Sequence, residues 1–306
     1  MRTGEAVAIK FESKTTAHPQ LMLEVTFYKM LNARDPSIRF IPKVLYFGPI
    51  ETYHALIMEK LGPSLLNMMR KCGGSFSITT TTQILWQLFN IMEYVHERRL
   101  LYRDVKPENF LIGLPDTDKW CTVYLIDLGF CKSYLTDDFE HIPQITNKPV
   151  AGTLRYMSIS NQDGCEVSRR DDLEALMYMA VYIFKHELPW DVVKDPDIVE
   201  RGRKTSMRLI DNIIYRLIFI DFILIYVIMS GAMKKQFMPE QLMSNMPLQY
   251  VQIMTMIQKL KFEERPPYRR LMALLNDVLT WLGISYREQF YDWDRFHNPI
   301  QLSLRS

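Results

Sequence analysis

The hydrophobic pattern of this sequence changes its period near residue 60. Upstream, short apolar runs alternate with turn residues and predict strands at 7–9, 43–47 and 55–58, with one helical stretch at about 20–31. Downstream, apolar residues recur three and four positions apart, as they do along one face of a helix. A β-rich part followed by a larger helical part predicts an α+β fold of two unequal lobes. The lobes would meet near residues 59–62 and leave a cleft, a common place for a ligand.

Three helices are indicated in the downstream part. The third, at about 268–282, is followed by Gly283, a residue well suited to end a helix. Asp171 is expected to cap the start of the second, and Pro189 comes where that helix should stop. The apolar stripes consist of Ile84, Leu85, Leu88, Ile91, Met92 and Val95 in the first helix, and of Leu173, Leu176, Met177, Ala180, Val181 and Phe184 in the second.

The composition excludes several classes of protein. Of the 306 residues, 48% are apolar and 24% are charged, which is typical of a folded chain. The 37 basic and 35 acidic residues nearly balance, so no broad basic surface for nucleic acid is expected. The four cysteines lack the spacing of a metal site, and the first residues lack the apolar core of a signal peptide. We therefore expect an intracellular protein, cytoplasmic or nuclear, that binds no nucleic acid.

An unusual mixture of side chains follows the first of these helices. Residues 102–109 read Tyr-Arg-Asp-Val-Lys-Pro-Glu-Asn, and core packing does not require that combination. Asp127 follows the apolar run 123–125, which places a carboxylate at the end of a strand. Strand pairing would bring Asp127 to Asn109, and two oxygen ligands of this kind suit Mg²⁺. Asp104 then remains available as a general base.

Three short motifs give the sequence a recognisable resemblance. VAIK at 7–10, YRDVKPEN at 102–109 and IDLG at 126–129 resemble, in that order, the lysine strand, catalytic loop and metal-binding loop of protein kinases. More narrowly, the chain resembles the casein kinase 1 superfamily over roughly 3–206 and 232–295. The narrower resemblance rests on HPQL, LGPSL, DVKPENFL, GTLRYMSIS, SRRDDLE and LPW.

The resemblance implies a bilobal, protein-kinase-like fold. Residues 1–61 would form a partial small lobe, 62–295 a larger helical lobe, and 296–306 a tail. Only nine residues precede Lys10, and no glycine-rich loop of the kind that covers ATP phosphates is found, so we expect an N-terminally incomplete kinase domain.

An apolar block at about 205–231 departs from the family's spacing, and we interpret it as an insertion foreign to the fold. Its most apolar part, 213–229, is shorter than the about 20 residues that a membrane span needs, and it contains Asp221. No membrane span is therefore expected. Tyr102 and Leu128 replace the family's usual histidine and phenylalanine, both at packing positions near the metal-binding aspartate.

The resemblance assigns roles to the charged residues. Lys10 would contact the α- and β-phosphates of ATP, with Glu24 as its ion-pair partner. Asp104 would orient the substrate hydroxyl and accept its proton, and Lys106 would neutralise the γ-phosphate. Asn109 and Asp127 would hold Mg²⁺, and Asp172 would brace the catalytic loop.

The resemblance also implies an adenine site and a substrate class. The hinge would be Glu59, Lys60 and Leu61 behind Met58, with Ala8 and Leu111 closing on the adenine from either side. The enzyme would prefer Ser/Thr in acidic or already phosphorylated protein substrates. A cationic pocket would bind the substrate phosphate and would be formed by Arg155, Lys148 and Arg201. The alternative for Arg155 and Arg201 is a surface arginine paired with a neighbouring acid.

Two functions remain open on the sequence. The retained set of charged residues favours an active Ser/Thr kinase that uses ATP and Mg²⁺. The missing glycine-rich loop favours a pseudokinase or scaffold that keeps the fold without useful phosphate transfer.

Overall fold

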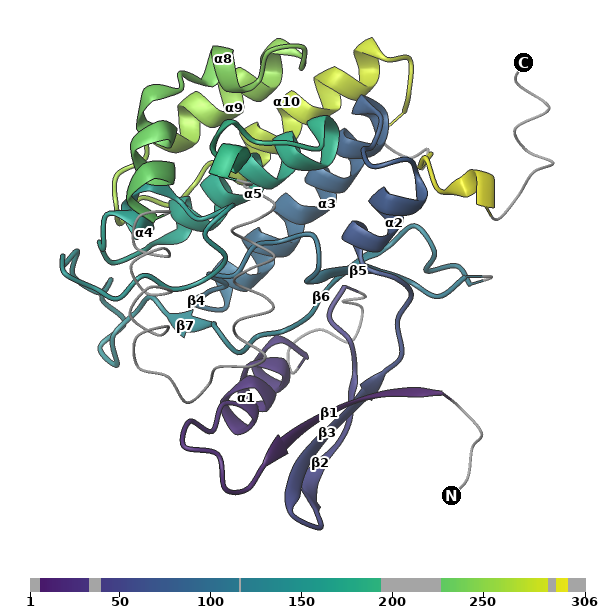
Figure 1. Ribbon diagram of the computed structural model, residues 1–306, viewed down its shortest axis with the longest axis vertical. Helices are drawn as coiled ribbons and strands as arrows, with labels where there is room; N and C mark the ends of the chain where they lie inside the picture. Colours follow the sequence, from purple (N-terminus) through teal and green to yellow (C-terminus); the bar gives the residue numbers. More distant parts are fainter. Residues whose placement is uncertain (1–5, 33–39, 116, 194–226, 286–289, 297–306) are drawn as a thin grey trace.

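The computed structural model of the protein describes residues 6–32, 40–115, 117–193, 227–285 and 290–296 (Figure 1). Arg201, most of the apolar block at 205–231, and all of the predicted tail except Phe296 lie outside these residues. The described chain forms the expected α+β fold, with strands and one helix at the N-terminal end and a mainly helical remainder. No helix within these ranges combines the length and hydrophobicity that crossing a membrane requires.

The N-terminal part is a three-stranded antiparallel sheet covered by one helix. The strands lie in the order β1 (Val7–Ser13), β3 (Tyr53–Glu59), β2 (Val44–Ile50), so β1 is an edge strand of the described sheet. The helix, α1 (Leu21–Asn32), contacts β2 and β3. These elements confirm the four predicted from the periodicity.

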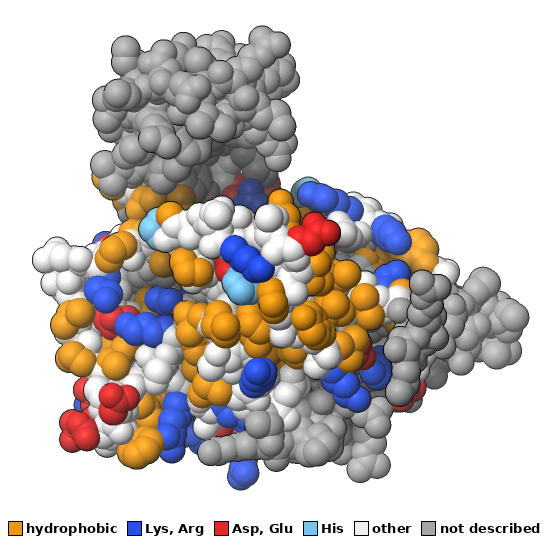
Figure 2. Space-filling model, turned by 90° about the horizontal axis from the view of Figure 1, so that it is seen from below, with side chains coloured by type: hydrophobic (Ala, Val, Ile, Leu, Met, Phe, Trp, Pro, Cys, Tyr) orange, Lys and Arg blue, Asp and Glu red, His pale blue; other side chains and the backbone are white. Residues whose placement is uncertain are grey.

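The two faces of this sheet differ. Residues paired across antiparallel strands share a face, and the pair Lys10–Leu56 lies on the face whose lysine reaches the α1 residue Glu24. The opposite face carries exposed apolar side chains. Figure 2 views the molecule from the end at which the sheet lies in Figure 1, and hydrophobic groups gather in that view. The exposed apolar members of the opposite face are Val7, Ile9, Phe11, Tyr46, Ile50 and Tyr53.

The C-terminal part is built on a long buried helix, α3 (Ile78–Glu97), which packs against α5 (Arg169–Lys185) and α10 (Tyr268–Trp281). Both predicted apolar stripes lie on these helices and are almost entirely buried. Gly283 follows α10 with φ +72°, the left-handed conformation expected of a residue that ends a helix. The remaining described elements are α2 (Leu65–Lys71), α4 (Ile159–Gln162), η1 (Pro189–Val193), a helix at 227–236, α8 (Pro239–Leu242), α9 (Leu248–Gln258) and η2 (Asp294–Phe296).

The predicted cap of α5 is wrong. Ser168, not Asp171, occupies the N-cap position, and the Asp171 carboxylate accepts a hydrogen bond from the Ser168 backbone N–H at 2.7 Å. Asp171 is therefore the acidic third residue of a capping box. The helix ends at Lys185, before Pro189, because His186 adopts the left-handed conformation.

Two short antiparallel strand pairs place the loops that carry the charged residues. Strands β5 (Phe110–Ile112) and β6 (Val123–Leu125) follow each other along the chain and pair with Phe110 opposite Leu125. Strands β4 (Leu100–Leu101) and β7 (Lys132–Ser133), which lie before and after them in the chain, form the second pair. Residues 102–109 therefore run between β4 and β5, beside the turn that leaves β6.

Candidate functional site

Asp104 is the centre of the candidate site. Its side chain is almost fully buried, and its two carboxylate oxygens accept hydrogen bonds from three residues. Lys106 Nζ lies 2.5 Å and Asn109 Nδ2 3.0 Å from Asp104 Oδ2, while Thr153 Oγ1 donates to Asp104 Oδ1 at 2.8 Å. The carboxylate is thus held in one orientation at the junction of two loops.

Asp172 braces the loop on which Asp104 lies, as the sequence predicted. Its carboxylate accepts the backbone N–H groups of Tyr102 at 2.7 Å and Arg103 at 2.8 Å. His96 Nε2 lies 2.9 Å from the same carboxylate. Arg103 has φ +69°, a strained conformation for a residue with a side chain, and the bonds to Asp172 hold it there.

Strand pairing brings Asp127 beside Asn109, as expected. Asn109 directly precedes β5 and Ile126 directly follows β6, and the Ile126 N–H donates to the Asn109 carbonyl at 3.0 Å. Asp127 follows with φ +59°, and its N–H donates to the Tyr28 hydroxyl at 3.0 Å. Tyr102, at the position of the family's histidine, donates its hydroxyl proton to the Ile126 carbonyl at 2.9 Å. The backbone on both sides of the Ile126–Asp127 peptide is therefore held by tyrosines.

Lys10 links the two parts of the protein. Its Nζ lies 2.7 Å from Glu24 Oε2 on α1 and 3.0 Å from Asp127 Oδ1. Burial works against the charge, but hydrogen bonds and attraction from both carboxylates outweigh it, so the pKa of Lys10 is raised above its ordinary value. A charged ammonium group is thus held between helix α1 and the turn after β6.

The residues assigned to the adenine site lie in neighbouring segments. Ala8 pairs with Met58 across β1 and β3, on the sheet face that also carries Lys10. Leu111 forms a bridge with Ser64, and the Gly62 N–H donates to the Ile112 carbonyl at 2.9 Å. The segment after β3, which includes the assigned hinge residue Leu61, therefore runs beside β5. The Glu59 side chain turns to Lys119, at 2.6 Å.

Of the predicted substrate-phosphate residues, Arg201 lies outside the described part of the chain, and the two that are described, Arg155 and Lys148, each pair with a different acid. Arg155 Nε lies 2.7 Å from Asp191 Oδ1, which is the pairing with a neighbouring acid that the sequence left open. Lys148 Nζ lies 3.3 Å from Glu166 Oε2, and Lys132 Nζ lies 2.8 Å from the same oxygen. Although burial opposes it, the two ammonium groups hold the pKa of Glu166 below its ordinary value. The phosphate role of these residues stays a prediction.

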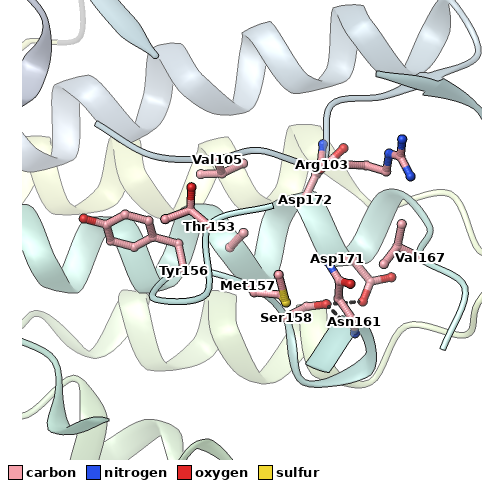
Figure 3. A pocket seen from close by; sticks show the side chains of 11 residues that line it. Arg103, Val105, Thr153, Tyr156, Met157, Ser158, Asn161, Val167, Asp171 and Asp172 are labelled. Atoms are coloured by element: carbon pink, nitrogen blue, oxygen red, sulfur yellow. Dashed lines mark hydrogen bonds between the residues drawn. The ribbon is translucent and has the colours of Figure 1, made fainter. Parts of the chain in front are cut away.

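A small cavity lies between the catalytic loop and the segment that follows Gly152 (Figure 3). Its volume of about 20 Å³ has room for a single water molecule, so it is not a nucleotide site. Gly152 allows the close approach of the two loops, since it has φ +105° and an added Cβ would lie 2.5 Å from the Arg103 carbonyl oxygen. Among the residues that line the cavity, Ser158 donates to Asp171 at 2.7 Å.

The side chains of Asn109 and Asp127 fit a magnesium ion. The Asn109 amide nitrogen is used on Asp104, which leaves its oxygen for a metal, and the Asp127 carboxylate supplies a second hard donor. No cluster of three or more His, Cys, Asp or Glu suited to a metal occurs among the described residues. Mg²⁺ does not need one, because it commonly takes one or two protein ligands together with water and phosphate oxygens.

Comparison with known proteins agrees with this geometry. The family described as the protein kinase domain matches residues 1–269. The chain belongs to the protein kinase family. The kinase is 35% identical to "Casein kinase I homolog 1" of Saccharomyces cerevisiae over 97% of this chain and 50% of the relative. It is 34% identical to "Casein kinase I homolog 2" of Schizosaccharomyces pombe over 95% of this chain and 60% of the relative. The resemblance to casein kinase 1 is thereby confirmed.

The kinase chain spans about half of the Saccharomyces relative and three fifths of the Schizosaccharomyces relative. Within it, the predicted residues Lys10, Glu24, Asp104, Asn109 and Asp127 form one connected constellation. Sequence reasoning assigned no role to Thr153, Tyr28 or His96. Thr153 lies in the GTLRYMSIS motif, whose position after the metal-binding loop was a usable signal, whereas Tyr28 and His96 are ordinary helix residues by pattern.

Proposed function

We propose that this chain is a Ser/Thr protein kinase of the casein kinase 1 type, which transfers the γ-phosphate of ATP to protein substrates. The observation that carries the proposal is the arrangement around two acids. Asp104 is oriented by Lys106, Asn109 and Thr153, and Asp127 is held beside Lys10 and Asn109. A fold that served only as a scaffold would have no chemical need for this arrangement.

Each residue has a task that its position supports. MgATP, when bound, supplies the phosphoryl group. Asn109 and Asp127 would hold the Mg²⁺ ion, and Lys10 would bind the α- and β-phosphates. Asp104 would orient the incoming hydroxyl and accept its proton, and Lys106, 2.5 Å away, would stabilise negative charge on the transferred group.

We further propose that the substrates are acidic or already phosphorylated proteins. Lys132 and Lys148 set two ammonium groups against the single carboxylate of Glu166. A substrate phosphate could take the place of Glu166 on either lysine. Arg155 would have to leave Asp191 to bind a phosphate, so Lys148 is better supported than Arg155 as a phosphate contact.

The test is phosphate transfer from ATP in the presence of Mg²⁺. Casein and a matched pair of Ser-containing peptides, one with a second serine phosphorylated near the acceptor and one without that phosphate, serve as substrates. The proposal predicts phosphoserine and phosphothreonine in casein and a preference for the phosphorylated peptide. Absence of transfer, together with nucleotide binding seen as a thermal shift, would favour the scaffold. Equal rates on both peptides would overturn the substrate preference alone.

A further inference from the structure

The helix at 227–236 lies against the segment 153–163, which begins at Thr153, the residue that contacts Asp104. Three of its residues contact that segment. Ser230 Oγ accepts a hydrogen bond from Gln162 Nε2 at 2.8 Å, and Lys235 Nζ lies 2.6 Å from Asp163 Oδ1. The third residue, Lys234, is buried and contacts the beginning of the segment. Lys234 Nζ donates to the carbonyl oxygens of Leu154 at 3.0 Å and Met157 at 2.8 Å. The helix therefore holds both ends of this segment.

Lys234 is an unusual residue for this place. It is only 2% exposed, whereas its neighbour Lys235 lies on the surface. Its ammonium group lies over the rings of Tyr178 and Trp190, at 5.2 Å and 5.0 Å from their centres. Burial lowers the pKa of Lys234 to about 7, against the attraction of Glu174 and Asp191. Packing alone does not explain a lysine here, because an apolar side chain of similar length would fill the space without that cost.

The bonds made by Lys234 act on the backbone around Arg155. The Trp190 indole N–H donates to the Arg155 carbonyl at 2.8 Å, so the carbonyls of residues 154, 155 and 157 are all held from one side. Thr153, immediately before them, donates to Asp104. Figure 3 shows Thr153, Tyr156, Met157 and Ser158, from this same segment, among the residues that line the cavity. The backbone that Lys234 holds therefore directly follows a residue that contacts Asp104.

We propose that Lys234 is a positioning residue for the protein substrate: through the carbonyls of Leu154 and Met157 it fixes the backbone that borders Asp104. It does not touch the nucleotide site, so it acts on the peptide and not on ATP. The proposal rests on the proposed kinase function for its kinetic consequence. Its structural consequence, an ordered segment at 154–160, is independent of that function.

The experiment compares Lys234→Met with Lys235→Met, which removes an adjacent ammonium group from the same helix. For Lys234→Met we expect the KM for casein or peptide to rise at least 10-fold, with unchanged ATP affinity and an unchanged rate of ATP hydrolysis by water. Amide hydrogen exchange at 154–160 should become at least 10-fold faster. Lys235→Met should resemble the wild type in all four measurements. A protein-substrate KM within 2-fold of wild type in Lys234→Met would overturn the proposal.

The same measurements remain informative if the wild type is inactive or if Lys234→Met does not fold. A wild-type protein that transfers no phosphate contradicts the proposed function, and the hydrogen-exchange comparison then still decides the role of Lys234. If Lys234→Met does not fold, Lys234→Gln replaces it, because a shorter neutral side chain cannot hold both the Leu154 and the Met157 carbonyls. It should raise the protein-substrate KM at least 3-fold and leave ATP affinity unchanged, and an unaltered KM would count against the proposal.

Discussion

The backbone N–H of Asp127 donates to the hydroxyl oxygen of Tyr28 at 3.0 Å, and this bond ties helix α1 to the turn after β6. Tyr28 is fully buried, and Asp127 has φ +59°, a conformation that costs a residue with a side chain about 1 kcal/mol or more. The bond therefore contributes to keeping the carboxylate of Asp127 beside Lys10.

Tyr28→Phe should weaken the metal site without removing a ligand. The N–H of Asp127 loses its acceptor, at a cost of about 1–2 kcal/mol, or about 10-fold in affinity. We expect kcat/KM for ATP to fall about 10-fold and the Mg²⁺ concentration needed for half-maximal activity to rise. Tyr53→Phe, on the exposed face of β3, is the control and should change neither. Unchanged Mg²⁺ dependence in Tyr28→Phe would show that the bond has no functional weight.

Lys10→Met should abolish the stabilisation that ATP provides. A ligand at 100 times its dissociation constant stabilises a protein by about 2.7 kcal/mol, and the variant loses the cation assigned to the phosphates. Differential scanning fluorimetry with MgATP measures the shift. Lys14→Met is the matched control, because Lys14 directly follows β1 and its exposed ammonium group donates to the Glu51 carbonyl. A wild-type-sized shift in Lys10→Met would exclude the phosphate role.

Asp172→Asn should destabilise the fold as well as the site. One carboxylate receives the N–H groups of Tyr102 and Arg103 and the ring of His96, and an amide can accept only through its single oxygen. We expect a loss of about 2–4 kcal/mol in urea unfolding, together with a loss of activity. Asp163→Asn breaks only the exposed pair with Lys235 and should change stability by less than about 1 kcal/mol. Equal stabilities of the two variants would contradict the bracing role.

Glu174 should make stability depend on pH near neutrality. Burial raises the pKa of Glu174 from 4.5 to about 7, so the folded state binds a proton that the unfolded state releases. The contribution of Glu174 to the free energy of unfolding is therefore fully present below pH 4.5 and is lost as the pH rises through 7. In Glu174→Gln, which keeps an oxygen for the Ile159 N–H and the Tyr178 hydroxyl, this loss should be absent.

Between pH 5 and 6, which lies below the pKa of about 7 of Lys234, unfolding of the wild type should become about 1 kcal/mol easier relative to Glu174→Gln. Urea titrations of both proteins at each pH measure this difference. Parallel pH profiles of the two proteins would mean that Glu174 does not titrate in this range.

Much of this architecture was predictable because it follows from the local spacing of apolar residues in the sequence. Strand and helix periods reflect burial on one face, so β1, α1 and α3 followed from the sequence. The meeting of Asn109 and Asp127 was also predictable, since pairing of two strands fixes which residues lie opposite each other.

The contacts that complete the site were not predictable in this way. Thr153 is 49 residues from Asp104, Tyr28 is 99 from Asp127, and Lys234 is 80 from Leu154. A hydroxyl or a lysine on a helix has no local pattern that reveals such a partner. The misplaced cap at Asp171 has a different cause, because Ser168 lies just three residues earlier and both residue types cap helices well.

The most direct measurement of the central claim is the rate of phosphate transfer to casein by the wild type and by Asp104→Asn. The variant keeps the shape of the side chain but removes the proton acceptor, and general base catalysis is commonly worth about 10²–10⁴-fold. Asp137→Asn, an exposed aspartate on the loop that leads toward Gly152, is the control for general charge loss. We predict a fall of at least about 100-fold for Asp104→Asn, with ATP affinity and the Asp137→Asn rate unchanged. Equal rates for wild type and Asp104→Asn would contradict the account.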